Sequence, residues 1–147
     1  MRLAHDTLVL VADGRKMLMF RNEGDAEAPN LIVEKVETIE NPADRDQKTD
    51  AQGQRPSSAT PGQDSTGEVD FHQQEEDRFA ASTAETLKMR ALRGEYDKLV
   101  VVAAPKLLGA LRKHYHKEVE HRLTAEIAKD LTGHPKDKIE AILLASD

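Results

Sequence analysis

The stretch KLVVVAA, residues 98–104, is the most strand-like run in the chain. Its apolar residues are uninterrupted and rich in β-branched valine, a pattern typical of a strand that is buried on both faces of a sheet. Pro105 follows directly, at a position where a helix can begin. We therefore predict a central strand covered on both faces, followed by a short helix over residues 105–114.

Three strand-like segments lie closer to the N-terminus. The apolar run TLVLVA at residues 7–12 is separated from residues 15–21 by Asp13-Gly14. A DG dipeptide between two such runs is a strong hairpin signal because both residues tolerate positive φ. Residues 31–39 alternate in part between apolar and polar, which indicates a half-exposed strand. The three segments together predict a meander.

A polar segment, residues 41–68, separates this meander from the rest of the chain. It contains no Leu, Ile, Val, Met, Phe or Tyr. Such a segment cannot bury enough apolar area to offset the entropy lost on ordering. Because 147 residues is a length typical of one domain, we predict a single domain over residues 1–147 with a mobile loop at 41–68.

Helical spacing follows this segment. Six residues share one face of the expected helix: Phe79, Ala80, Thr83, Ala84, Leu87 and Ala91. Asp70 is the expected N-cap, because Gln73 lies three residues further on, as in a capping box. Gly94 is the expected stop. The pattern predicts a long amphipathic helix from Asp70 to about Arg93.

The C-terminal third contains one ambiguous segment. Apolar residues four apart, from Val119 to Leu131, indicate a helix. The alternation of Leu123, Ala125 and Ile127 with polar neighbours indicates a strand instead. A last amphipathic helix is expected over residues 136–144. Taken together, the elements predict an α/β domain with helices packed on a mixed sheet.

Composition excludes several classes of protein. The chain has no Cys, which rules out a disulfide framework, a thiolate nucleophile and Cys-ligated metal. No apolar run approaches the length of about 18 residues that a membrane span needs. The first residues, MRLAHD, contain no apolar segment of the secretory type. We expect a cytoplasmic protein that has no membrane contact and needs neither a metal nor a cofactor.

Charge is distributed unevenly along the chain. The formal net charge is −6, yet residues 98–138 carry nine basic and five acidic side chains. The candidate partner-binding residues are Lys106, Arg112, Lys113, Lys117 and Arg122. Such a basic patch beside the end of the central strand is suited to phosphate groups of RNA or of a nucleotide. The alternative is a solvated helix face balanced by Glu118 and Glu120.

Several motifs, in their order along the chain, resemble the bacterial host attachment protein family. They are DTLVLVADGR (6–15), RNEGD (21–25), FHQQEEDRFA (71–80), LGALRK (108–113) and EIAKDLT (126–132), followed by His134-Pro135. That family is similar in turn to the central domain of archaeal and eukaryotic peptide release factors and of Pelota. The resemblance implies a ribonuclease-H-like fold: a mixed sheet of about five strands, ordered as meander, helix, strand, helix, strand and helix. It favours a strand near residues 122–128.

The resemblance also implies candidate chemistry. In release factors, a loop between the third strand and the following helix carries a Gly-Gly-Gln tip that reaches the ribosome. The corresponding segment here contains Gly53-Gln54 and Pro61-Gly62-Gln63, with one Gly before each Gln. Gln63 is therefore the candidate catalytic residue of a hydrolase, and a solvated loop is the alternative.

Two other chemical readings have weaker support. Asp13 invites comparison with the first metal-binding acid of ribonuclease-H nucleases, but the geometry of a DG turn explains an aspartate at this position better. His114 and His116 would share a face only on an extended segment. The chain contains no P-loop, GxGxxG, nucleophile elbow or HExxH motif. This favours a binding module over an enzyme.

We therefore expect a non-enzymatic, cytoplasmic, release-factor-like module that acts through a macromolecular partner, the ribosome or RNA. One alternative is a hydrolase that uses the 41–68 loop on peptidyl-tRNA or nucleic acid. Another is a regulatory protein of host attachment without RNA contact.

Overall fold

The computed structural model describes residues 1–38 and 61–146, and only the backbone over 61–72. Its elements, in chain order, are β1 (Leu8–Ala12), β2 (Lys16–Asn22), β3 (Leu31–Thr38), α2 (Pro61–Leu92), β4 (Leu99–Ala103), α3 (Pro105–Arg112), α4 (Lys117–Arg122), β5 (Leu123–Ile127) and α5 (Lys136–Ala145). Among the helices of the described ranges, none has the length and apolarity that a bilayer crossing requires.

The strands form one mixed sheet in the order β3-β2-β1-β4-β5. The first three strands are antiparallel neighbours, and β4 runs parallel to both β1 and β5. The predicted α/β class and the five-stranded mixed sheet are confirmed. The two most apolar runs of the sequence, β1 and β4, lie side by side at the centre of the sheet, where every residue of both strands is buried.

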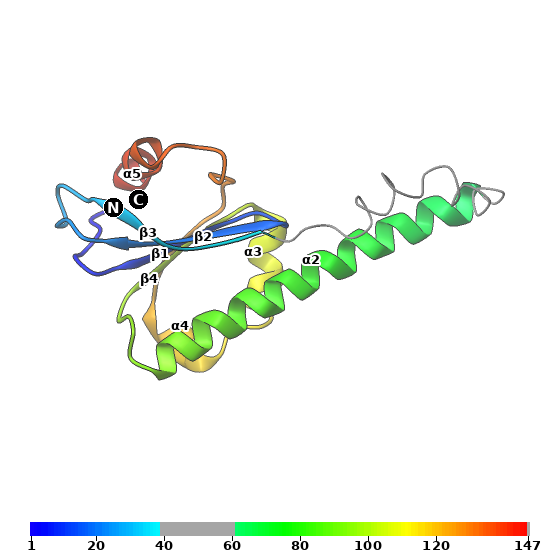
Figure 1. The fold of residues 1–147 in the computed structure, drawn as a ribbon, viewed down its shortest axis with the longest axis horizontal. Helices are drawn as coiled ribbons and strands as arrows, with labels where there is room; N and C mark the ends of the chain where they lie inside the picture. The colour runs from blue at the N-terminus through cyan, green and yellow to red at the C-terminus, as the bar shows by residue number, and fades with distance from the viewer. Residues whose placement is uncertain (39–60, 147) are drawn as a thin grey trace.

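Helices cover both faces of the sheet, with α2, α3 and α4 on one face and α5 on the other (Figure 1). The alternation of side chains along β1 and β4 divides the core accordingly. Leu8, Leu10, Leu99 and Val101 cluster with residues of α2 and α3, whereas Val9, Val11, Val100 and Val102 cluster with residues of α5. Each such buried side chain stabilises the fold by roughly 1.5–3 kcal/mol. The central strands hold both clusters together.

Helix α2 buries the predicted face, since Phe79, Ala80, Thr83, Ala84, Leu87 and Ala91 are all at most 3% exposed. It ends before Gly94, which adopts a φ of +70°. The predicted start at Asp70 is wrong, because the helix begins at Pro61. Of the predicted 41–68 loop, residues 41–60 lie outside the described residues, and residues 61–68 belong to α2.

Both patterns of the ambiguous segment have a structural counterpart. Val119 is buried on the short helix α4, and the alternating residues after it form β5. The strand predicted near 122–128 is confirmed at Leu123–Ile127. The helix predicted over residues 105–114 ends at Arg112.

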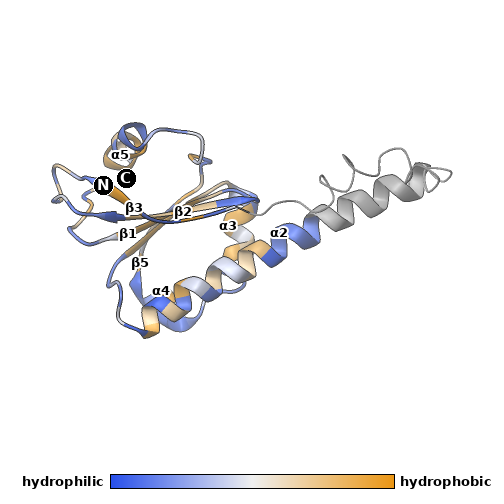
Figure 2. Cartoon of the chain, viewed as in Figure 1, coloured by the Kyte–Doolittle hydropathy of each residue, from blue (hydrophilic) through white to orange (hydrophobic). Residues whose placement is uncertain are grey.

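Strand β3 is more exposed than predicted. After Leu31, every residue of the strand is exposed, including residues on both faces of the sheet. The strand pairs only with β2, so one of its edges is free of any other described strand. Apolar colouring is concentrated in the middle of the sheet in Figure 2.

Candidate functional site

Two of the five predicted partner-binding residues are held by carboxylates of the chain itself. Arg112 donates to Glu126 on β5, with Nη2 2.7 Å from Oε1. Arg122 donates to Glu118 Oε1 at 2.9 Å and, through Nε, to the Tyr96 carbonyl at 3.0 Å. The hydrogen bond from Arg122 also lowers the pKa of Glu118. These two arginines therefore contribute little uncompensated positive charge.

The remaining three predicted residues differ among themselves. Lys106, in the first turn of α3, lies 4.0 Å from Glu76 Oε1 of α2. Lys113 and Lys117 are exposed, and neither has an ion pair or side-chain hydrogen bond within residues 1–38 and 61–146. They lie at the junction of α3 and α4. This junction is where the predicted basic surface retains free charge.

Three histidines lie near this junction, and one of them, His116, caps a helix. His116 is the N-cap of α4, where its Nδ1 accepts from the Glu118 N–H at 3.0 Å. The His116 ring thus caps the N-terminus of α4. His114 and His121 are exposed. The described part of the chain contains no group of three or more His, Asp or Glu placed to hold a metal ion.

Asp13 acts as a turn residue. Its Oδ1 accepts from the backbone N–H groups of Arg15 and Lys16, at 2.8 and 2.7 Å. Its Oδ2 accepts from the Thr132 hydroxyl at 2.9 Å. Asp13 therefore closes the β1–β2 hairpin and fastens it to the segment after β5, which agrees with the turn explanation.

The carboxyl ends of β1 and β4 are occupied by the chain's own side chains. Glu76 from α2 lies against Gly14, where an added Cβ would be 3.0 Å from Glu76 Oε2. Glu76 Oε1 is buried and has no hydrogen-bond partner among the described residues. A phosphate group bound at the carboxyl ends of β1 and β4 would lie close to the Glu76 carboxylate and be repelled by it. This end of the sheet is therefore poorly suited to binding an anion.

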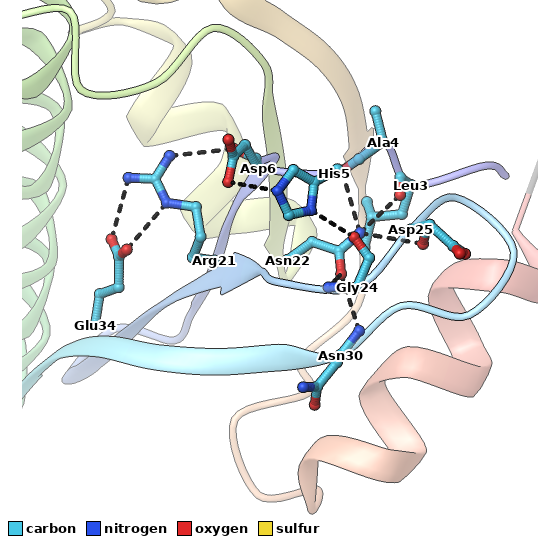
Figure 3. Close-up of polar contacts among 10 residues, drawn as sticks. All are labelled: Leu3, Ala4, His5, Asp6, Arg21, Asn22, Gly24, Asp25, Asn30 and Glu34. Atoms are coloured by element: carbon cyan, nitrogen blue, oxygen red, sulfur yellow. Dashed lines mark hydrogen bonds and ion pairs between the residues drawn. The ribbon is translucent and has the colours of Figure 1, made fainter.

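The RNEGD motif has a structural explanation (Figure 3). The Asn22 side chain is fully buried; its Nδ2 donates to the carbonyls of Leu3 and Ala4, and its Oδ1 accepts from the N–H groups of Gly24 and Asn30. Asn22 thereby joins the N-terminal segment to the turn after β2. Gly24 is required there because an added Cβ would lie 2.2 Å from the Ala28 carbonyl oxygen.

A network of partly buried ion pairs lies beside this turn, and the sequence analysis does not predict it. Glu34 on β3 accepts from Arg21 of β2, with Nε 3.0 Å from Oε2, and from Arg90 of α2, with Nη2 2.6 Å from Oε1. Arg90 Nε also donates to Glu95 at 2.9 Å. Figure 3 shows Arg21 reaching Glu34 on one side and Asp6 on the other. Glu34 lies 13 residues from Arg21 and 56 residues from Arg90, so no local signal in the sequence marks these two pairs.

The charged groups of this network shift one another's pKa values. Partial burial of Glu34 opposes its ionisation, but hydrogen bonds from Arg21 and Arg90 outweigh that effect and hold its pKa below the usual value. Burial of Arg90 is likewise outweighed by Glu34 and Glu95, so its pKa is raised. The four groups balance in charge, which makes this a structural clamp between β3 and α2.

A groove of about 450 Å³ lies between β3 and α2, next to this clamp. Its lining is mostly charged: Glu34, Lys35, Glu85, Thr86, Met89, Arg90, Arg93 and Glu95. Positive and negative side chains are equal in number along it. Opposite charges therefore share this groove, and its lining residues together carry no net formal charge.

Gln63, the candidate catalytic residue, belongs to the first turn of α2, where the structure describes only the backbone. This end of α2 runs past the edge of the sheet and lies against no other described element in Figure 1. Gly53-Gln54, the other glycine–glutamine pair, lies outside the described residues. Gln63 is thus remote from the Asn22 turn, the Glu34 clamp and the α3–α4 junction.

Comparison with known proteins relates this chain to a protein family and to a protein of Rickettsia prowazekii. The sequence profile of a family described as bacterial archaeo-eukaryotic release factor family 12 matches residues 6–143. An uncharacterized protein of Rickettsia prowazekii (strain Madrid E), RP470, is 36% identical over 55 residues. That match covers 37% of this chain and 37% of the Rickettsia protein.

Proposed function

Because this chain belongs to family 12 of the bacterial archaeo-eukaryotic release factors, we propose that it is a release-factor-like module that works by binding the ribosome. It acts in the cytoplasm, and it catalyses no reaction of its own. The role in host attachment implied by the sequence resemblance is, on this proposal, an indirect result of changed translation.

The projecting end of α2 is the observation that carries this proposal. The helix has 32 residues, which corresponds to about 48 Å. Among the described side chains, the buried face of α2 begins at Phe79, and Glu76, three residues before it, still contacts Gly14. The turns that precede Glu76 extend beyond the core (Figure 1). An isolated helix of this kind is only marginally stable in water. Docking on a partner would supply the packing that the domain itself does not provide.

The α3–α4 junction supplies the second contact in this proposal. Lys113 and Lys117 are exposed and unpaired among the described residues, and they lie on the helical layer that includes α2 (Figure 1). Unpaired lysines are suited to phosphate groups of ribosomal RNA. The proposal assigns no RNA contact to Arg112 and Arg122, which are already paired.

Co-sedimentation with ribosomes tests this proposal. Lys113→Glu with Lys117→Glu should weaken ribosome binding, and it should reduce the salt dependence of binding by about one unit of slope per lysine. The control is Lys129→Glu with Lys138→Glu, which makes the same charge change at two exposed residues, one in the segment after β5 and one in α5. Equal binding by both double variants, or no binding by the unaltered chain at low salt, would refute the proposal.

The placement of Gln63 supports one alternative, a hydrolase acting on peptidyl-tRNA. Its backbone lies in the first turn of α2, at the end that projects from the domain. A glutamine carried there would reach a distant ester and help to position water. Release of the peptide from peptidyl-tRNA on ribosomes should then be abolished by Gln63→Ala and unaffected by Gln73→Ala. Absence of release by the unaltered chain would dismiss this alternative.

A further inference from the structure

The free edge of β3 carries three exposed β-branched side chains. Ile32, Val33 and Val36 are 41%, 50% and 54% exposed. The strand is eight residues long, and among the described strands it pairs only with β2. An exposed apolar edge of this kind is a template for pairing with another strand, unless charge or distortion prevents it. What can pair there depends on which side chains share a face.

A register shift decides the faces of β3. Glu37 is opposite Met17 and Lys35 is opposite Met19, but beyond the shift between Met19 and Phe20, Val33 is opposite Phe20. Residues directly opposite each other point to the same face. Lys35 and Glu37 therefore lie on the face covered by α2.

The same register places Val36 opposite Leu18, on the other face of the sheet. Val33 lies on that face too, because Phe20 belongs to the cluster that includes α5 residues. The free edge of β3 thus presents two opposite charges on one face and two valines on the other.

Lys35 and Glu37 have no ion pair or side-chain hydrogen bond within the described ranges, and both are exposed. They flank Val36 symmetrically. If a second β3 pairs antiparallel with the first and Val36 faces its own copy, Lys35 lies opposite Glu37 of the other strand, and Glu37 lies opposite Lys35. Both contacts join opposite charges, which is the favourable arrangement for directly opposed residues.

Neighbouring registers lack this match. Centring the pair on Lys35 places two lysines opposite each other, and centring it on Glu37 places two glutamates opposite each other. Centring it on Glu34 repeats that conflict and disturbs a carboxylate already bound by Arg21 and Arg90. Like charges directly opposed are destabilising. Among registers that face a residue with itself, the one at Val36 is self-complementary.

We propose that β3 is a homodimer interface, in which two copies of this chain pair antiparallel about Val36 and join their sheets edge to edge. The self-complementary charge pattern selects a second copy over an unrelated strand, which would have no reason to match both Lys35 and Glu37. The joined strands also bring Val36 of the two copies together on one face. This interface is independent of the ribosome contacts proposed above.

A charge-swap series with the full chain tests the interface by sedimentation velocity over a range of concentrations. The unaltered chain should show a monomer–dimer equilibrium. Lys35→Glu should weaken the dimer about tenfold or more, because both cross-strand contacts then join like charges. Glu37→Lys should weaken it equally. Lys138→Glu, a change of the same charge on α5, should leave the equilibrium unchanged.

Mixing the two single variants is the decisive step. A Lys35→Glu chain and a Glu37→Lys chain have opposite charges at both contacts, so the mixture should form a heterodimer although each variant alone is monomeric. Recovery in the mixture also shows that neither variant is misfolded. An unaltered chain that is monomeric at its highest soluble concentration overturns the proposal. So does a mixture that remains monomeric.

Discussion

Glu34 Oε1 lies 2.6 Å from Arg90 Nη2 and thereby ties an exposed edge strand to the packed end of α2. The same carboxylate binds Arg21 of β2. The arginine side chains are only 11% and 15% exposed, and that of Glu34 is 30% exposed. The carboxylate of Glu34 therefore binds two largely buried cations, and the contact between β3 and α2 depends on its ionisation.

Glu34→Gln should lower the free energy of unfolding by about 1–2 kcal/mol at neutral pH, since both arginines lose a charged partner. The pKa of Glu34 lies below its ordinary value of 4.5 when folded, so the unfolded chain binds more protons there. Its contribution is full above that ordinary value and is lost as the pH falls through the lower, folded pKa. Urea unfolding at decreasing pH should show the two chains converging; a constant difference would contradict this role.

Asn22→Asp should destabilise the chain by about 3 kcal/mol or more at neutral pH. The replacement keeps the shape but sets a carboxylate oxygen against the Leu3 and Ala4 carbonyls, which now accept from Nδ2. Thermal unfolding measures the loss. Asn30→Asp is the matched control, because that side chain is exposed and its Oδ1 accepts from Lys136. Equal effects of the two changes would show that Asn22 is not the organising residue of the turn.

Thr83→Val should raise the free energy of unfolding by about 0.5–1 kcal/mol. Thr83 is 2% exposed, and its hydroxyl has no hydrogen-bond partner in the part of the chain that the structure describes. Valine keeps the volume and removes an unsatisfied polar group. Chemical denaturation of Thr83→Val should be compared with Thr86→Val, which removes a hydroxyl that donates to the Ser82 carbonyl. A loss of stability at Thr83 would mean that its hydroxyl is bonded.

Gln74→Pro should separate the projecting part of α2 from its packed part. Gln74 is exposed and precedes Phe79, the first residue of the buried face. Proline interrupts a helix interior at a cost of about 3 kcal/mol, yet here the core residues remain helical. Circular dichroism should show lost helicity with little change in the melting temperature, and ribosome co-sedimentation should fall. Gln74→Ala is the control, and a large drop in melting temperature would contradict a separate arm.

Sequence reasoning located the elements that bury apolar side chains. The runs at β1 and β4, the DG turn and the face of α2 from Phe79 to Ala91 are all marked by local periodicity. The start of α2 was missed because residues 61–69 have no apolar face, and periodicity reports only helices that pack against a core. The exposure of β3 beyond Leu31 was underestimated because alternation does not reveal which face is covered.

The candidate site was harder to predict from sequence. The sequence identifies the basic residues but not their partners. Arg112 pairs with Glu126 of β5, and no residue within one helical turn of Arg112 indicates this pairing. Glu34 lies within the half-exposed strand predicted over residues 31–39, and its two arginine partners lie 13 and 56 residues away in the sequence. Pairings of this kind depend on the strand order of the sheet, which cannot be read from local sequence patterns.

Helix α2 packs against the sheet only in its C-terminal part, from Phe79 onward among the described side chains, so a rotation there moves its N-terminal end. From Phe79 to Pro61, α2 extends about 27 Å, so a tilt of roughly 10° at its root displaces its far end by about 5 Å, close to one helical turn. Beyond Phe79, the apolar face of α2 packs against the sheet, and Arg90 near the C-terminal end of the helix binds Glu34. Small changes in packing at the sheet are therefore amplified at the Pro61 end of the helix, and a force applied to that end acts first on the packing around Phe79.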